Sequence, residues 1–174
     1  MDPVINHSTF IDVPPRAVYD ALATADGLNA WFTTDSEVDA REGGRIDFRW
    51  RGFGVDRTDL DDHGPVLVAE RGRRLTFQWH PSASGRPTTV DIRLSPWGRG
   101  TRVEVRESGY TLSDDDLSAC IGCAVGWGEA LTLLKYHLEA PSAFVHPCRW
   151  WDAGAPATDA DGAHDGAEAR LAHA

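Results

Sequence analysis

Residues 113–138 read SDDDLSACIGCAVGWGEALTLLKYHL, and this stretch decides the fold. Ser113 with Asp116 three residues later has the spacing of a capping box, and an acidic first turn suits the positive end of a helix dipole. Apolar or small residues then recur at steps of three and four, at Leu117, Cys120, Ala124, Trp127, Leu131, Leu134 and Leu138. The spacing predicts one long helix that ends at about Leu138.

The two halves of this predicted helix differ in side-chain size. The first half contains Gly122, Gly126 and Gly128, whereas the second half is rich in leucine. An interior glycine costs a helix about 1 kcal/mol relative to alanine, so three of them indicate that space or close approach matters on this segment. If the helix lies on the concave face of a sheet, we expect the glycine-rich half to overlie a hollow and the leucine-rich half to seal the core.

Upstream of this helix, the sequence alternates between apolar and polar residues, which is typical of half-buried strands. The alternation is clearest over residues 46–50, 75–79, 90–94 and 103–105. Residues 66–70 alternate less cleanly and are also assigned to a strand, and the polar run 57–64 is interpreted as a turn. Short connections between consecutive strands predict an antiparallel meander.

The N-terminal part combines one strand with two short helices. Residues 4–13 alternate in polarity, and Pro14 and Pro15 then stop the strand and preset a helical turn. A first short helix is expected at 15–24. Asp26 is expected to cap a second one, because its side chain can accept hydrogen bonds from first-turn amides. The inward-facing residues of that second helix are Leu28, Trp31 and Phe32.

This order of elements resembles the START-related helix-grip superfamily, and more narrowly its bacterial branch related to the C-terminal domain of the heat-shock-protein-90 ATPase activator. The segments that carry the likeness are IDVPP at 11–15, VYDAL at 18–22, LNAWF at 28–32, GRIDF at 44–48, RRLTFQW at 73–79 and Gly126-Trp127. The likeness covers about residues 4–140. It implies an α+β helix-grip domain over residues 1–140, in which a curved antiparallel sheet (β-α-α-β meander-α) wraps around the long C-terminal helix.

The resemblance also implies a cavity between sheet and helix that holds lipids, polyketides or other apolar small molecules, and some relatives are cyclases or other enzymes. The residues whose parity would make them line it are Trp31, Phe32, Phe48, Trp50, Phe77, Trp79, Thr88, Val90, Ile92, Val103, Val105, Cys120, Cys123, Ala124 and Trp127. Aromatic walls suit flat apolar ligands. A stripe of aromatics on strands is also what a plain core requires, so both interpretations stay open.

Glu107 is the candidate for chemistry, because it shares its parity with Val103 and Val105 and a buried charge is costly unless it is paired. It could recognise a polar group or act as a general base, and His80 and Tyr110 could join it at the cavity mouth. The alternative is that Glu107 lies past the buried stretch and pairs with an arginine in water.

Composition narrows the function classes. The chain has 174 residues, and 17 Lys and Arg against 27 Asp and Glu give a net charge of −10, which argues against nucleic acid and anionic membranes as partners. Three cysteines make no secreted disulfide framework, and no leader or apolar span is evident, so a cytoplasmic setting is predicted. Cys120 and Cys123 form a lone CxxC, and we expect no metal or cofactor.

After residue 140 the composition changes. Residues 141–152 contain Phe144, Trp150 and Trp151 and are interpreted as an aromatic docking segment, which could pair two copies in a homodimer. Residues 153–174 are predicted to be a disordered acidic tail. Three functions stay open: binding of an apolar small molecule, a cyclase-type enzyme that uses Glu107, and a co-chaperone of a heat-shock ATPase. Whether the chain is an enzyme is left undecided.

Overall fold

The computed structural model describes residues 2–150. In chain order the elements are β1 (Val4–Ile11), α1 (Pro15–Ala23), α2 (Ala25–Trp31), β2 (Glu37–Val38), β3 (Arg45–Phe53), β4 (Thr58–Glu70), β5 (Arg74–Trp79), β6 (Thr88–Trp97), β7 (Gly100–Ser108), α3 (Asp114–Glu139) and the 3-10 helix η1 (Pro147–Arg149). The strands form one sheet in the order β1-β7-β6-β5-β4-β3-β2, and every neighbouring pair is antiparallel. The predicted α+β helix-grip fold is confirmed.

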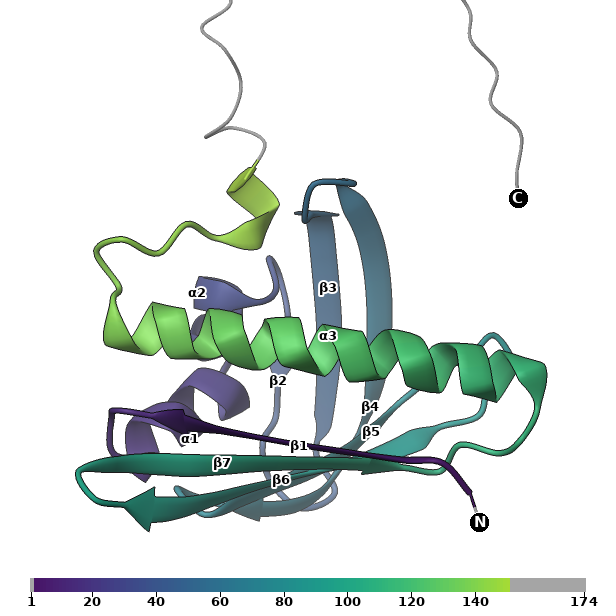
Figure 1. Ribbon diagram of the computed structural model, residues 1–174, viewed down its shortest axis with the longest axis horizontal. Coiled ribbons are helices and arrows are strands. Elements are labelled where there is room, and N and C mark those ends of the chain that lie inside the picture. Colours follow the sequence, from purple (N-terminus) through teal and green to yellow (C-terminus); the bar gives the residue numbers. More distant parts are fainter. Residues whose placement is uncertain (1, 151–174) are drawn as a thin grey trace, which may run out of the picture.

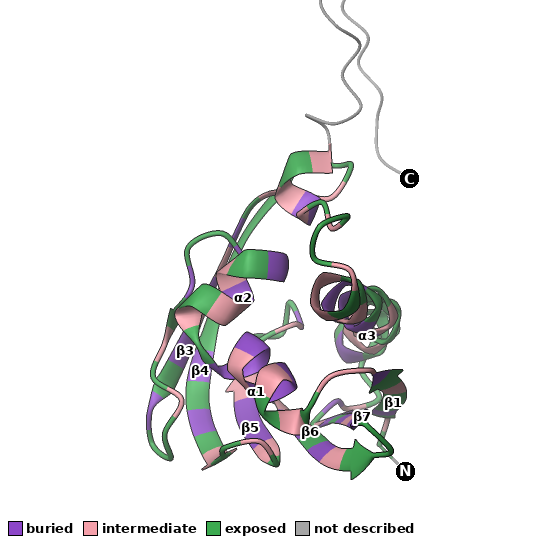
Figure 2. Ribbon diagram, turned by 90° about the vertical axis from the view of Figure 1, so that its left-hand side faces the viewer, coloured by how far each residue is buried: buried purple, intermediate pink, exposed green. Residues whose placement is uncertain are grey.

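The sheet curves around the three helices. Figure 2 shows it bending from β3 and β4 round to β1 and β7, with α1, α2 and α3 on its inner side. In Figure 1, α3 runs across the sheet from one edge of the domain to the other. Alternate residues of β3, at Ile46, Phe48 and Trp50, are buried as their parity predicts.

The prediction that residues 57–64 form a turn is wrong, because residues 58–64 belong to β4. It is a single strand of 13 residues, Thr58–Glu70, whose first half pairs with β3 and whose second half pairs with β5. The charged residues of the first half hid this pattern. Asp61 lies opposite Arg49 and forms an ion pair with Arg51 at 2.7 Å, so the outer face of the strand is polar.

The helix termini follow the predicted capping with one correction. Ser113 caps α3, and its Oγ accepts a hydrogen bond from the Asp116 amide at 3.3 Å. The cap of α2 is Thr24 and not Asp26, because α1 ends at Ala23 and a single residue separates the two helices. Thr24 Oγ1 accepts from the Gly27 amide at 2.9 Å, and Asp26 lies in the first turn.

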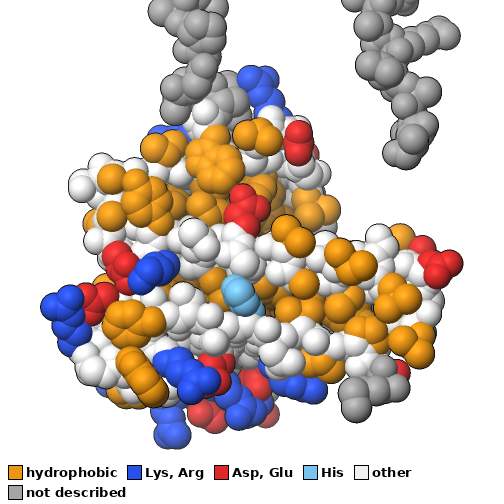
Figure 3. Space-filling model, viewed as in Figure 1, with side chains coloured by type: hydrophobic (Ala, Val, Ile, Leu, Met, Phe, Trp, Pro, Cys, Tyr) orange, Lys and Arg blue, Asp and Glu red, His pale blue; other side chains and the backbone are white. Residues whose placement is uncertain are grey.

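The two halves of α3 have different surroundings. Leu131 and Leu134 in the second half are buried, as the stripe predicts, and so is Trp127 near the end of the first half. Earlier in the first half Leu117 is 37% exposed and Ala124 is also exposed, so the stripe is wrong at these two positions; this part of the helix stands off the sheet above a cavity described below. Figure 3 shows hydrophobic side chains gathered on the surface over this part of the helix.

By length and composition α3 is apolar enough to cross a membrane, a criterion that core helices of soluble proteins also meet. Only 28% of its most apolar window is buried. In this fold the helix contacts β1 and α2 instead of standing alone.

The segment after α3 lies against the domain. Phe144 packs edge-on to Tyr136, with 5.9 Å between ring centroids, and His146 Nε2 lies 3.1 Å from the carbonyl oxygen of Thr33. Trp150 Nε1 donates to the Val145 carbonyl oxygen. Trp151 and the acidic tail 153–174 lie outside the described residues, so the boundaries of the docking segment and the disorder of the tail stay predictions.

Candidate functional site

An apolar cavity of about 230 Å³ lies between the first half of α3 and strands β3, β4 and β5. Its lining residues are Phe32, Trp50, Phe53, Thr58, Leu60, Trp79, Gly122, Cys123, Gly126, Trp127, Glu129 and Ala130. A Cβ atom added at Gly122 or Gly126 would meet nothing within 4 Å, so these glycines leave the cavity open on the helix side. The cavity lies where the sequence places a hollow beneath the glycine-rich half.

A second cavity of about 570 Å³ continues the first one. The residues common to both linings are Trp50, Leu60, Trp79, Gly122 and Cys123. Beyond them the second cavity reaches Asp61, Asp62, His63 and His80. We call the two cavities together the groove, the first its apolar end and the second its polar end.

Glu107, on β7, is fully buried behind the apolar end. Its Oε1 accepts hydrogen bonds from Trp79 Nε1 at 2.7 Å, Thr88 Oγ1 at 2.6 Å and Tyr110 OH at 2.7 Å. Its Oε2 accepts from Trp127 Nε1 at 2.7 Å. All four partners donate, which is the complement that an ionised carboxylate requires. Among residues 2–150 no basic side chain forms an ion pair with Glu107, so the alternative of an arginine partner in water is wrong.

This bonding fixes the wall of the groove. Trp79 and Trp127 both line the apolar end, with 5.6 Å between their ring centroids, and both turn their N–H toward Glu107. The indoles therefore offer ring faces and C–H edges to the groove and no free donor. Each carboxylate oxygen has about two acceptor positions. Three donors therefore saturate Oε1, whereas Oε2 accepts a hydrogen bond from Trp127 alone.

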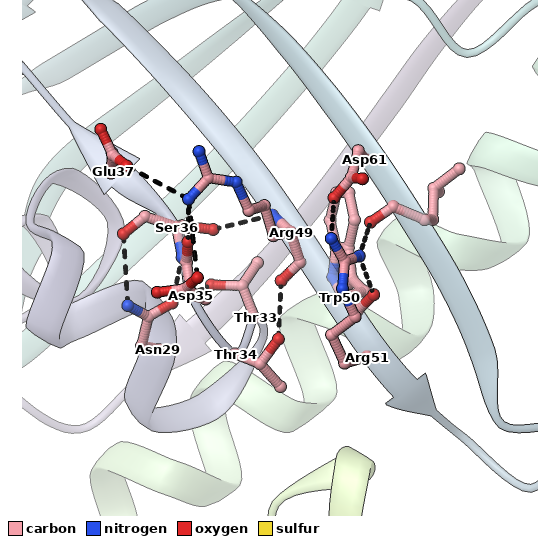
Figure 4. A network of polar contacts seen from close by, with 11 residues as sticks. Asn29, Thr33, Thr34, Asp35, Ser36, Glu37, Arg49, Trp50, Arg51 and Asp61 are labelled. Atoms are coloured by element: carbon pink, nitrogen blue, oxygen red, sulfur yellow. Dashed lines mark hydrogen bonds and ion pairs between the residues drawn. The ribbon is translucent and has the colours of Figure 1, made fainter.

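The rim beside α2 is held by a polar network (Figure 4). Asn29 Oδ1 accepts from the Ser36 amide at 2.8 Å, and Ser36 Oγ accepts from the Arg49 amide at 3.1 Å. Because these bonds tie the loop after α2 to β3, Phe32 is held edge-on to Trp50, with ring centroids 5.2 Å apart. Hydrogen bonds from the backbone amides of Ser36 and Arg49 to side chains thus hold Phe32 and Trp50 in place at the rim.

The chain matches the family described as "Activator of Hsp90 ATPase homolog 1-like protein" over residues 12–139. It belongs to this family. No curated protein matched the chain. Among solved structures, the solution structure of the Aha1 dimer from Colwellia psychrerythraea is 26% identical, with a TM-score of 0.65, over 79% of this chain and 97% of that one.

Two further solved structures resemble this family member, and one of them comes from a biosynthetic locus. CalU16 from Micromonospora echinospora is 24% identical over 82% of this chain and 87% of its own, with a TM-score of 0.59. DynU16, a protein of the dynemicin biosynthetic locus, is 19% identical over 86% of this chain and 51% of its own, with a TM-score of 0.68. At these identities the two neighbours show a shared fold.

Only some of the predicted lining residues of this family member reach the groove. Phe32, Trp50, Trp79, Cys123 and Trp127 line the apolar end, and His80 lines the polar end. The predicted residues that lie behind the groove as buried core or as partners of Glu107 are Trp31, Phe48, Phe77, Thr88, Val90, Ile92, Val103, Val105 and Tyr110. Cys120 is partly buried and Ala124 is exposed, and neither lines the groove.

The core behind the groove is closely filled. Phe48 packs against Trp50 and Phe77 with ring centroids 5.6 and 5.4 Å apart. The space left among these rings and their neighbours is about 20 Å³. That space suffices for about one water molecule, so the interior behind the groove has no room for a larger molecule.

The contribution of β4 to this site was not predicted from the sequence. Leu60 and Asp62 lie opposite Trp50 and Phe48, so they share the inward face of the sheet, and Leu60 lines both cavities. The signal was present: Leu60, Asp62, Gly64 and Val66 are spaced by two. It was hidden because an aspartate and a glycine occupy positions where an apolar residue would have completed the alternation.

Cys123 is expected to react slowly with thiol reagents. Burial raises the pKa of its thiol from 9.0 to about 11, which lowers the thiolate fraction at pH 8 roughly 100-fold. Iodoacetamide should therefore alkylate Cys123 about 100-fold more slowly in the folded chain than in urea, as measured by peptide mass spectrometry. Equal rates in the two states would contradict the burial of this thiol.

Tyr110, which contacts the same carboxylate, is also kept neutral. Burial raises the pKa of its phenol above its ordinary value, and hydrogen bonds with Cys123 and Glu107 raise it further. Tyr110 therefore donates its proton to Glu107 without losing it, and the interior behind the groove holds Glu107 among neutral donors.

Proposed function

We propose that the protein binds a flat apolar small molecule in the groove, as a carrier or handling protein. The observation that supports this most is the wall itself. Both indole N–H groups are taken up by Glu107, and Phe32, Phe53 and the two indoles present aromatic surface around an open space. Aromatic walls bury large area against flat molecules, and such cavities are the usual form of small-molecule sites.

The size of the groove limits the guest. An apolar cavity of about 150 Å³ accommodates benzene, so the 230 Å³ apolar end suits a guest portion of about two fused rings. Typical sites for larger ligands have volumes of about 300–1,000 Å³, which the apolar end reaches only together with the polar end. A longer guest would therefore extend past Trp79 toward His80.

A cyclase-type enzyme is the second candidate, favoured by the position of Glu107 directly behind the indoles that line the groove. In that case Glu107→Gln would abolish turnover while a guest still binds. The family name and the dimer from Colwellia psychrerythraea keep a co-chaperone role and a homodimer as further proposals. These rest on the relatives, whereas the binding function rests on the groove of this chain.

Filling the groove tests the proposal. Gly126→Leu would place a side chain in the apolar end, where a Cβ meets no atom within 4 Å. We expect the dissociation constant of the fluorescent probe N-phenyl-1-naphthylamine to rise roughly tenfold or more, because the leucine takes up the volume of the guest.

Ala124→Leu is the matched control, since it adds the same side chain to an exposed position of the same helix. Its dissociation constant for the probe should stay within about twofold of the unsubstituted chain. Binding of equal strength in all three proteins would show that the probe binds elsewhere and would count against the proposed function.

A further inference from the structure

The polar end of the groove contains the inward-facing carboxylate of Asp62. The binding of a purely apolar molecule would give this carboxylate no role. Asp62 lies opposite Phe48 on the inner face of the sheet, and its side chain is 13% exposed. Its Oδ1 accepts from the His63 amide at 2.6 Å and its Oδ2 accepts from the His80 amide at 2.8 Å. Asp62 thereby holds the chain just after β5 against β4.

The same contacts orient the His80 ring. His80 Nδ1 lies 3.1 Å from the carbonyl oxygen of His63 and 3.3 Å from Asp62 Oδ1. Both of these atoms are acceptors, so Nδ1 must carry a proton and donate it. In the neutral ring Nε2 is then an acceptor. Within residues 2–150 no hydrogen bond to His80 Nε2 is present, and the side chain is 36% exposed and lines the polar end.

The charges around His80 Nε2 limit which chemical groups can donate a hydrogen bond to it. The lining of the polar end includes Asp61 and Asp62 but contains no lysine or arginine. Asp61 is paired with Arg51, whereas Asp62 is satisfied by two amides and the His80 ring. A carboxylate or phosphate placed here would face Asp62 without a cation to offset the repulsion. A neutral hydroxyl can donate to Nε2 without that cost.

We propose that the polar end selects guests that carry a hydroxyl donor, a phenol or an enol, and that His80 is the specificity-determining acceptor with Asp62 as its positioning residue. The guest class is a flat apolar molecule with one hydroxyl beyond its rings, and molecules with an anionic end are disfavoured. This inference rests on the proposed function, because it requires the rings of the guest to occupy the apolar end beside Trp79.

The test compares 2-naphthol with 2-methoxynaphthalene, in which a methyl group replaces the hydroxyl hydrogen, by equilibrium dialysis against the full chain. We expect 2-naphthol to bind roughly five- to tenfold more tightly, the ratio that one neutral hydrogen bond typically supplies. His80→Phe keeps a ring but removes the acceptor, so it should reduce the ratio to about one. The affinity for 2-methoxynaphthalene should stay within about twofold.

His63→Phe is the matched control, because the His63 ring lies 5.6 Å from the His80 ring in the same lining, while its contact with Nδ1 comes from its backbone. The ratio should survive in this variant. Three outcomes would overturn the inference about the polar end. The first is an affinity ratio of 2-naphthol to 2-methoxynaphthalene near one in the unsubstituted chain, and the second is a ratio that survives in His80→Phe. The third is tighter binding of 2-naphthoate than of 2-methoxynaphthalene. If none of these probes binds, the proposed function itself fails.

Discussion

Replacing Glu107 with leucine is expected to lower the free energy of unfolding by roughly 3 to 5 kcal/mol. The substitution removes the acceptor of four donors that come from β5, β6, α3 and the segment after β7. Each donor left unpaired in a dry interior costs about 1–3 kcal/mol, and partial rearrangement keeps the total below their sum. Urea denaturation followed by circular dichroism measures the change.

Glu104→Leu supplies the control on the same strand. Glu104 faces outward, is 43% exposed and pairs with Arg102 at 2.7 Å, so its loss should cost less than about 1 kcal/mol. Glu107→Gln should fall between the two, because the amide keeps the shape but turns one acceptor into a donor that faces another donor. A Glu107→Leu protein as stable as the Glu104→Leu protein would refute the structural role of the buried carboxylate.

Leu134→Ala is expected to destabilise the fold by about 3 kcal/mol, since large-to-small changes at fully buried leucines leave a cavity. Leu134 is 0% exposed in the leucine-rich half of α3. Leu117→Ala, in the half that stands off the sheet, is the control: Leu117 is 37% exposed and its truncation should cost less than about 1 kcal/mol. Equal losses in urea denaturation would mean that α3 packs along its whole length.

The architecture could be predicted from the sequence because burial in this fold follows a simple period. β3 and β7 have one exposed and one buried face, and Ser113, the residue before α3, accepts a hydrogen bond from the first turn of that helix with its hydroxyl. The first half of β4 escaped prediction because its outward Asp61 pairs with Arg51 of β3 and its inward Asp62 interrupts the apolar positions. Alternation identifies a strand only when the inner face is apolar throughout.

The site was harder to predict, because parity gives the side of a strand and not the depth along it. Phe77 and Trp79 share a face of β5, yet Phe77 is packed among other rings and only Trp79 reaches the groove. Glu107 could be singled out as an inward polar residue. Of its partners, only Tyr110 was predicted to join it; the other three come from separate parts of the chain that the fold alone brings together.

Glu107 accepts hydrogen bonds from both indole N–H groups on the side away from the groove. The two indoles therefore need no hydrogen-bond partner within the apolar end. Phe53, Thr58 and Leu60, where β3 meets β4, line the same opening and take no part in that bonding. Substitutions at these positions can reshape the opening while the sheet stays coupled to the helix. Descendants of one ancestral gene could therefore diverge in the shape of this opening through drift at this hairpin alone, without an intermediate that fails to fold.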